Sequence, residues 1–164
     1  MKSVHSIPNN IYTLNELTHQ LRRWRLLDKK IVFTNGVFDI LHEGHIATLS
    51  EAASFGHILI VGINGDASVK RLKGESRPVN QQESRILLMA SLLMVDAVIL
   101  FEEDTPINLI TSILPDILVK GGDYTIDQIV GAKEVINNGG EVKTVNLREG
   151  FSTTNIIEKM KNLK

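Results

Sequence analysis

The chain has 164 residues with 18 basic and 19 acidic side chains, a formal net charge of −1, and no cysteine. The balanced charge excludes a bulk positive field for non-specific nucleic-acid binding, and the lack of cysteine excludes disulfides, thiolate metal sites and a cysteine nucleophile. Because no apolar run could cross a membrane and the start MKSVHSIPNN lacks a signal-peptide core, we expect a cytoplasmic protein with neither a membrane nor a nucleic-acid partner.

Short, continuous runs of β-branched and aliphatic residues predict five buried parallel strands. They lie at residues 29–36, 57–64, 96–101, 116–122 and 141–146. Between them, apolar residues recur with helical spacing. We expect helices around residues 14–27, 46–53, 86–93, 107–114 and 126–136. This alternation predicts an α/β fold, an open five-stranded parallel Rossmann-like sheet with helices on both faces.

Several of these helices have residues typical of helix ends. Asn80 is a candidate N-cap for the third helix, and Thr105 with Pro106 matches an N-cap followed by a first-turn proline. Gly139 follows the fifth helix, where glycine commonly terminates helices.

One domain over residues 1–164 accounts for all these elements, because the sequence contains no linker or internal repeat. It divides into an N-terminal segment and helix over residues 1–28 and a catalytic core over residues 29–164. Residues 1–12 precede the first helix, and we expect them to be loosely held.

The segment after the first strand has the most unusual chemistry. It places His42 and His45 on either side of Gly44 at the start of a helix. Two imidazoles beside a helix N-terminus suit a polyphosphate, and Gly36 permits a ligand to approach the backbone. A metal pair completed by Asp39 is the alternative, although a third strong ligand is not evident.

A basic cluster follows the second strand. It consists of Lys70, Arg71, Lys73 and Arg77. On a loop, these cations could neutralise phosphates, although such runs are also common on solvated surfaces. Because residues 66–78 contain few large apolar side chains, we expect them to form a lid that is mobile without ligand.

Arg85 is a separate candidate in the same part of the chain. It could hold a phosphate, or it could pair with Glu83 or Asp66. The spacing alone does not decide between these roles.

Polar residues also follow the last two strands. In the stretch KGGDY, Gly121 permits close backbone approach and Asp123 could accept hydrogen bonds from hydroxyls, although a tight turn capped by aspartate is the alternative. Near the C-terminus, Ser152, Thr153 and Thr154 could form an anion cradle or act as ordinary helix N-caps.

The string GVFDILHEGH resembles the HxGH signature of the cytidylyltransferase-like nucleotidylyltransferases, whose histidines bind nucleotide phosphates. The strings NGDASVKRLKGESRPVN, FEEDTP, LPDILVKGGDY and FSTTNII are similar to those of the family's adenylyltransferases that form ADP-heptose. The resemblance covers residues 28–162 in the family's order. Phe151 and Arg148 depart from the family's cytidylyltransferase pattern, which has isoleucine before STT, but the hydroxyl positions are unaffected.

The resemblance implies transfer of AMP from ATP to D-glycero-β-D-manno-heptose 1-phosphate, with Mg²⁺ carried on the nucleotide and no protein metal site. It implies catalytic roles for His42, His45, Lys70 and Lys73. It implies nucleotide or phosphate contacts at Asn35, Gly36, Phe38, Asp39, Gly44, Arg85, Gly121, Ser152, Thr153 and Thr154. It implies a sugar-phosphate pocket containing Asp66, Lys120 and Asp123.

Other functions remain open at this point. They are a CTP- or GTP-dependent transferase acting on glycerol 3-phosphate or another sugar phosphate, a non-catalytic nucleotide-binding module, and a metal-dependent hydrolase using Asp39, His42 and His45. The resemblance also implies a product used for lipopolysaccharide and, because no kinase precedes the domain here, a separate sugar kinase in the same pathway.

The resemblance further implies a homodimer, and one segment offers a physical reason. Residues 87–95 are apolar almost all round a helix, so that one side could be exposed and form a dimer contact. The alternative is a helix that is buried on both sides within one subunit, for instance beneath the N-terminal helix that carries Trp24.

Overall fold

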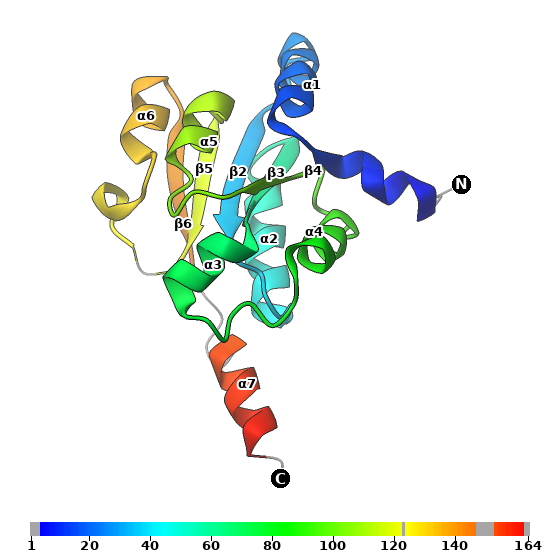
Figure 1. The fold of residues 1–164 in the computed structure, drawn as a ribbon. Helices are drawn as coiled ribbons and strands as arrows, with labels where there is room; N and C mark the ends of the chain where they lie inside the picture. The colour runs from blue at the N-terminus through cyan, green and yellow to red at the C-terminus, as the bar shows by residue number, and fades with distance from the viewer. Residues whose placement is uncertain (1–3, 123, 147–152, 163–164) are drawn as a thin grey trace.

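The computed structural model describes residues 4–122, 124–146 and 153–162. Its six strands are β1 (Ile11–Tyr12), β2 (Ile31–Gly36), β3 (Ile58–Asn64), β4 (Ala97–Phe101), β5 (Ile117–Gly121) and β6 (Glu141–Val145). They form one sheet in the order β1-β4-β3-β2-β5-β6, and all neighbouring pairs in it are parallel (Figure 1). The α/β class and the five expected strands, now β2 to β6, are therefore confirmed.

The expected number of strands is wrong because β1 adds a sixth at the edge. Ile11 lies opposite Val98 of β4, and both Ile7 and Ile11 pack against the core. A strand of two residues has no periodicity to detect, and its partner lies far along the chain. This described part of residues 1–12 is thus attached to the sheet, contrary to the expectation of a loosely held segment.

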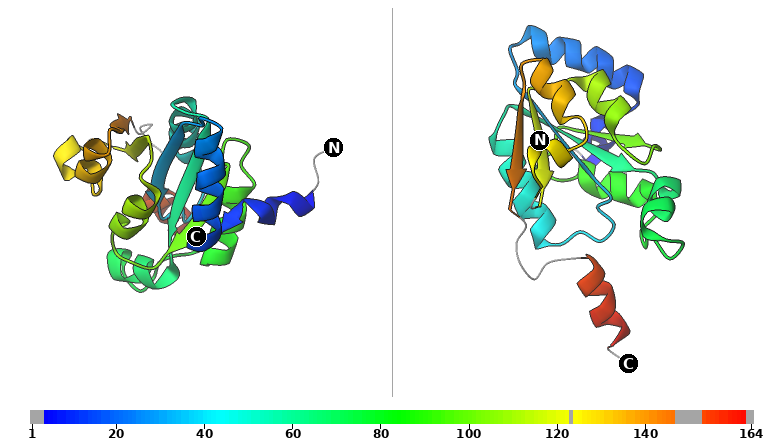
Figure 2. Two further views of the ribbon diagram at one scale, coloured as in Figure 1. Left: turned by 90° about the horizontal axis from the view of Figure 1, so that it is seen from above. Right: turned by 90° about the vertical axis from the view of Figure 1, so that its left-hand side faces the viewer.

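Helices cover both faces of the sheet (Figures 1 and 2). They are η1 (Val4–Asn10), α1 (Leu14–Leu26), α2 (Glu43–Ser54), α3 (Asp66–Lys73), α4 (Gln82–Ala90), α5 (Ile107–Ile113), η2 (Ile126–Gln128), α6 (Ala132–Asn137) and α7 (Thr153–Lys161). On one face α1, α5 and α6 pack around Phe33 and Ile110, and on the other α2 and α4 pack around Val61 and Met89. None of the helices in the described ranges is long and apolar enough to span a membrane.

Local sequence explains where α1 begins. The Thr13 hydroxyl accepts a hydrogen bond from the Glu16 N–H, and the Glu16 carboxylate accepts one from the Thr13 N–H. This reciprocal capping box satisfies two backbone donors that the helix itself leaves unpaired. The packing of α1 against α5 also overturns one alternative, because Trp24 lies on the opposite face of the sheet from α4.

The helix expected over residues 126–136 is divided into η2 and α6. Gly131 lies between them with φ of 84°, and a Cβ there would lie 2.7 Å from an Ile110 side-chain carbon. A continuous helix cannot pass through that backbone conformation. At the far end of α6 the expected termination is confirmed, since Gly139 has φ of 85°.

Two other helices begin slightly away from the expected caps. The N-cap residues are Gln81 for α4 and Pro106 for α5, rather than Asn80 and Thr105. The Asn80 side chain instead donates to the backbone oxygen of Asp39. The Asn80 side chain therefore makes a tertiary contact instead of capping α4.

Candidate active site

Two adjoining cavities open at the carboxyl ends of β2 and β5, where the strand order changes direction. The smaller has a volume of about 390 Å³ and contains both expected histidines; we call it the histidine compartment. The larger, of about 490 Å³, is called the second compartment. Residues that line both are Asn35, Gly36, Val37, Lys73, Lys120 and Tyr124. Open α/β sheets bind their ligands at this position.

The two histidines stack on each other at the start of α2. Their ring centroids are 3.8 Å apart with planes inclined by 21°, and the edge of Phe38 packs on His45 at 5.3 Å. Phe38 has φ of 49° and lies over Gly36, where a Cβ would be 3.0 Å from the phenyl ring. The glycine is therefore needed so that Phe38 can support the histidines.

Burial changes the protonation of both imidazoles. Burial, and then the charge of His42, lower the pKa of His45 to about 4, and burial also lowers the pKa of His42. Both rings are thus neutral near neutral pH, when each keeps one N–H to donate. His45 Nδ1 and Thr48 Oγ1 are buried without a hydrogen-bond partner among the described residues. Both residues line the histidine compartment, so these atoms could form hydrogen bonds with a polar ligand there.

Asp39 connects the histidine compartment to residues 77–80, which are distant in the sequence. Its carboxylate accepts hydrogen bonds from the N–H groups of Val79 and Asn80 and from Nε of Arg77, at 2.6 to 3.0 Å. Burial would raise the pKa of Asp39, but the hydrogen bonds from Asn80 and Val79 and the Arg77 guanidinium together lower it. The carboxylate therefore anchors residues 77–80 as an anion.

This anchoring bears on the metal alternative. Asp39 is only 2% exposed, and its carboxylate already accepts several donors. Within the described ranges, no group of three or more histidine, cysteine, aspartate or glutamate side chains is placed to hold a metal ion. The described geometry therefore gives no support to a metal site of Asp39, His42 and His45.

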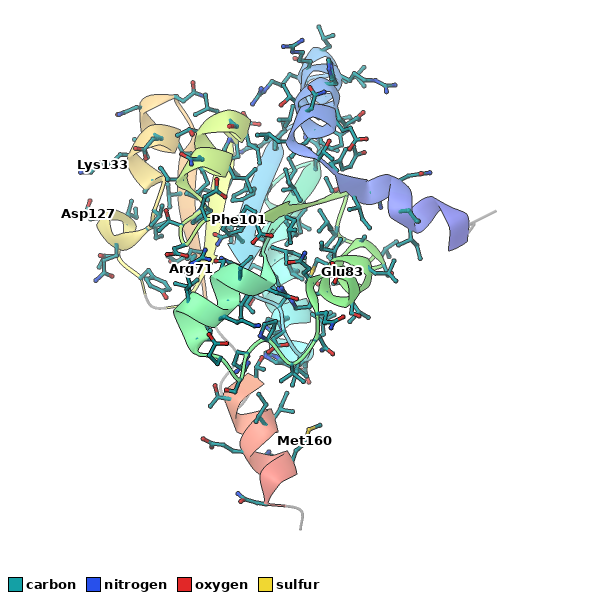
Figure 3. All side chains as sticks on the ribbon, viewed as in Figure 1. Arg71, Glu83, Phe101, Asp127, Lys133 and Met160 are labelled. Atoms are coloured by element: carbon teal, nitrogen blue, oxygen red, sulfur yellow. The ribbon has the colours of Figure 1, made fainter. Side chains whose placement is uncertain are left out.

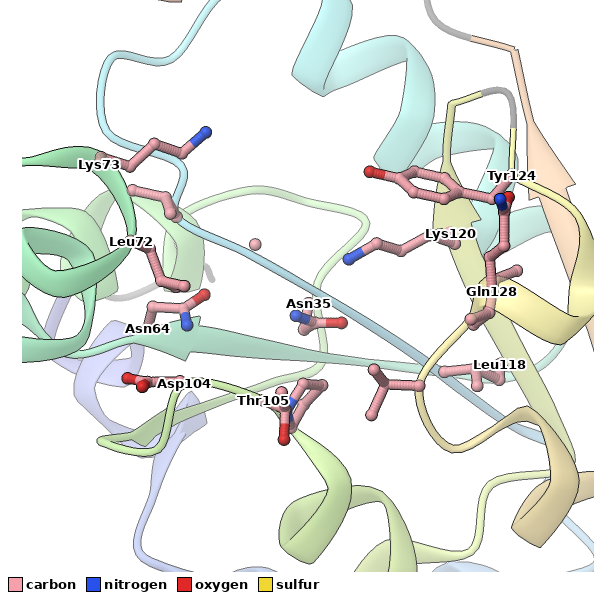
Figure 4. Close-up of a pocket in the computed structure, with 15 residues that line it drawn as sticks. Asn35, Asn64, Leu72, Lys73, Asp104, Thr105, Leu118, Lys120, Tyr124 and Gln128 are labelled. Atoms are coloured by element: carbon pink, nitrogen blue, oxygen red, sulfur yellow. The ribbon is translucent and has the colours of Figure 1, made fainter.

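Two lysines lie on the boundary between the compartments. Lys73, at the end of α3, and Lys120, at the end of β5, extend into the cleft from opposite sides (Figure 4). Burial, and then the charge of Lys73, lower the pKa of Lys120. An anion placed between the two side chains would favour the charged form of Lys120.

Lys70 does not share this position. It is exposed and lines neither compartment. The resemblance gave both lysines catalytic roles, and the structure brings only Lys73 to the cleft. Lys70 lies three residues before Lys73, which is the last residue of α3.

The segment expected as a mobile lid is largely a helix, α3, that is attached to the sheet. Ser68 and Val69 are fully buried, and the Ser68 hydroxyl donates to the Glu103 oxygen at 3.0 Å. Arg71 donates to the Asp104 carboxylate and to the Glu102 oxygen, both at 2.7 Å (Figure 3). These contacts join residues that are far apart in the sequence, so they could not be predicted from residues 66–78. The polar composition of that segment therefore suggested a mobile loop.

Arg85 and Asp66 also differ from expectation. Arg85 is fully buried and pairs with the Asp66 carboxylate at 2.7 Å, while Glu83 is exposed on the same helix (Figure 3). Neither Arg85 nor Asp66 lines a compartment. The pairing alternative with Asp66 is therefore the one that the structure shows. The structure therefore does not bring Arg85, expected as a phosphate ligand, or Asp66, expected as a sugar-phosphate contact, to either compartment.

Most of the other expected residues meet in one place. The expected residues that line the histidine compartment are Asn35, Gly36, Phe38, Asp39, His42, Gly44, His45, Lys73, Lys120, Gly121, Thr153 and Thr154. The two threonines open α7, which extends away from the sheet beyond the strand ends (Figure 1). Asp123 and Ser152 lie outside the described residues.

The second compartment contains polar residues that sequence reasoning did not select. Asn64 is the last residue of β3 and Thr105 lies in the loop after β4, and Tyr124 and Gln128 lie on the opposite side of the cleft (Figure 4). Leu72 and Leu118 add apolar surface. The position of Asn64 and Thr105 at or after the carboxyl ends of strands was the available signal, but neither belongs to a pattern of distinctive residue types.

The chain is similar in sequence to longer curated proteins. The bifunctional protein HldE of Haemophilus influenzae (strain PittGG) is 52% identical over 165 residues, which cover 99% of this chain and 35% of that protein. HldE of Salmonella arizonae is 54% identical over 150 residues, covering 92% of this chain and 31% of that protein. The chain thus spans about a third of the length of these curated relatives.

Solved structures show the same architecture. A lipopolysaccharide core biosynthesis protein from Thermoplasma volcanium has a TM-score of 0.58 at 32% identity, over 73% of this chain and 97% of that one. A pantoate-β-alanine ligase from Francisella tularensis has a TM-score of 0.59 at 20% identity, over 94% of this chain and 73% of that one, which shows the fold alone. The sequence model of the cytidylyltransferase-like family matches residues 33–159, and the chain belongs to that family.

Proposed function

We propose that this chain transfers AMP from ATP to D-glycero-β-D-manno-heptose 1-phosphate, giving ADP-heptose and pyrophosphate. The observation that carries the proposal is the pair Lys73 and Lys120, which lies where two substrate-sized compartments meet. Membership of the cytidylyltransferase-like family and similarity to HldE support the same reaction class.

The histidine compartment suits the nucleotide triphosphate. The neutral imidazoles of His42 and His45 and the N-terminal N–H groups of α2 can donate to phosphate oxygens. Thr153 and Thr154 line this compartment at the start of α7, where they can hold the departing pyrophosphate.

The second compartment suits the sugar phosphate. Asn64, Thr105 and Gln128 offer amide and hydroxyl groups that can both donate to and accept from a polyol. Lys73 and Lys120 then lie between the acceptor phosphate and the α-phosphate of ATP, where they neutralise charge on both. The acceptor must already carry a phosphate on its anomeric carbon, so a sugar kinase supplies the substrate.

No protein nucleophile is needed for this reaction. An oxygen of the sugar phosphate attacks the α-phosphorus in line, the bond to the bridging oxygen of the β-phosphate breaks, and pyrophosphate takes that electron pair. Mg²⁺ would accompany ATP, held mainly by phosphate oxygens, because the described residues offer no cluster of three acidic or histidine ligands. The chain itself supplies orientation and hydrogen-bond donors.

The test is pyrophosphate release measured with each of ATP, CTP and GTP against heptose 1-phosphate and glycerol 3-phosphate. We expect the largest kcat/KM with ATP and the heptose phosphate, and no release without an acceptor. A larger value with CTP or GTP would overturn the adenylyl assignment. Release without acceptor would favour a hydrolase, and nucleotide binding without turnover would favour a binding module.

A further inference from the structure

Arg85 joins four segments that lie around the cleft, although it does not reach the cleft itself. Its guanidinium donates from Nε to the Asn80 oxygen at 3.0 Å and from Nη1 to the Val37 oxygen at 2.7 Å. Nη2 donates to the Asn64 oxygen at 2.8 Å and to the Asp66 carboxylate at 2.7 Å. These partners belong to the loop after β2, the end of β3, the start of α3 and the loop before α4.

Because this guanidinium is buried, its orientation is tightly constrained by its hydrogen bonds. The Arg85 side chain is 0% exposed, whereas Asp66, its charged partner among the described residues, is 31% exposed. A buried cation is tolerated when its donors are satisfied and its charge is paired, and loss of one partner leaves a strong penalty. The side chain therefore has little freedom to turn toward a ligand.

One of the four segments leads directly to the cleft. Asp66 is the first residue of α3 and Lys73 is the last, so the helix connects the Arg85 ion pair to the lysine on the compartment boundary. The Asp66 N–H also donates to the Gln82 side chain on α4 at 2.9 Å. The beginning of α3 is thus fixed to α4 from both its side chain and its backbone.

We propose that Arg85 is a positioning residue that fixes α3, and through it the ammonium group of Lys73, against the carboxyl ends of the strands. The turnover part of this inference rests on the proposed function; the structural part does not. Since a displacement of about 1 Å can cost a reaction about 10²-fold, a buried contact remote from the chemistry can control the rate.

The experiment compares Arg85→Lys and Asp66→Asn with the wild-type protein, using two readouts. Amide hydrogen exchange over residues 66–73 reports on α3, and steady-state kinetics with ATP and heptose 1-phosphate report on Lys73. We expect faster exchange in α3 and a kcat at least about tenfold lower for Arg85→Lys, with the KM for ATP changed by less than about threefold.

A double-mutant cycle tests the route through Lys73. Asp66→Asn should lower kcat by about fivefold in the wild-type background and by less than about twofold when Lys73→Met is already present. Arg25→Lys is the matched control, because Arg25 also donates to backbone oxygens, those of Ile113 and Leu114, but between α1 and α5. It should leave kcat and α3 exchange unchanged.

Three results would overturn the proposal. A raised KM for ATP with unchanged α3 exchange would make Arg85 a phosphate ligand. A lower melting temperature with unchanged kcat would make Arg85 a purely structural residue. Additive effects of Asp66→Asn and Lys73→Met on kcat would show that Asp66 does not act through Lys73. If Arg85→Lys does not fold, Asp66→Asn carries the test. If the wild-type protein transfers no AMP, the proposed function fails, and the exchange measurement still decides the role of Arg85.

Discussion

The two sides of the histidine compartment are constructed in different ways. Phe38, His42 and His45 come from one continuous stretch of chain, and Gly36 in the same stretch makes room for the Phe38 ring. Lys73 and Lys120 come from α3 and β5, which are distant in sequence. The histidines therefore depend on local structure, whereas the position of Lys73 depends on contacts spread over the molecule.

The histidine side should show the largest effect of a single substitution. His45→Ala is expected to lower kcat by at least about 10²-fold while the fold survives, because preorganised donors to a developing charge are commonly worth that much. His42→Ala should be comparable. His19→Ala, on an exposed position of α1, is the control and should retain the wild-type rate. Near wild-type turnover in both cleft variants would contradict the role of the histidines.

The lysine side should show an effect that depends on position along α3. Lys73→Met is expected to lower kcat/KM by about tenfold or more, because it removes a charge-assisted contact to phosphate. Lys70→Met should lower it by less than about threefold, since that side chain lines neither compartment. Initial rates measured beside Lys133→Met, an exposed control on α6, check this. Equal losses for Lys70 and Lys73 would mean that α3 moves to bring both to the phosphates.

The burial of the histidines predicts a dependence of stability on pH. An unfolded histidine titrates near 6.5, whereas the pKa of His45 in the folded chain is about 4, so the unfolded chain binds more protons between these values. The free energy of unfolding should therefore fall as the pH drops from 6.5 toward 4, and this contribution is constant above that window.

Thermal unfolding of the wild-type protein and of His45→Gln at about pH 7 and about pH 5 measures this contribution. The midpoint of the wild-type protein should fall further than that of the variant. The lowered pKa of Asp39 affects stability only below its ordinary value of 3.8, outside this interval. Equal falls would show that His45 is not held neutral by the fold.

The smallest expected effect concerns assembly. The apolar residues 87–95 are not one helix, because α4 ends at Ala90, but Leu87, Leu88 and Leu93 are 48%, 44% and 84% exposed. We propose that they form a two-fold dimer contact. Light scattering at micromolar concentration should give about 36 kDa, twice the 18.2 kDa of the chain.

A charge at this surface should break the dimer without changing the fold. Leu93→Glu is expected to give the mass of one chain, whereas Leu26→Glu is the control, because Leu26 is equally exposed, at 84%, but lies at the end of α1. A monomeric wild-type protein would refute the dimer, and a dimer that survives Leu93→Glu would place the contact elsewhere.

Sequence reasoning succeeded where local pattern decides structure. Five strands were predicted because each is a continuous apolar run, and His42 and His45 were identified because their spacing near a helix start is unusual. It failed where tertiary contacts decide. The helix α3 has a polar sequence, yet Ser68 and Val69 are fully buried, and the Ser68 hydroxyl donates to the oxygen of Glu103 in the loop after β4.

The role of Arg85 was beyond sequence reasoning for a more general reason. Three of its four partners are backbone oxygens, of Val37, Asn64 and Asn80. Every residue carries such an oxygen, so no residue type signals the contact. Only Asp66 could be named from the sequence, and it was one of two acidic candidates.

The break at Gly131 bears on how acceptor preference could change in related enzymes. Gly131 allows the chain to turn between η2 and α6, and the η2 side contributes Gln128 and Val130 to the second compartment. Gln128 and Val130 are exposed and lie outside the packed core. Substitutions there can reshape the second compartment at little cost in stability, whereas Gly131, with Ile110 packed against it, is constrained. Under the proposed function, Gln128 and Val130 are therefore an accessible starting point for directed evolution of acceptor choice, provided that Gly131 is kept.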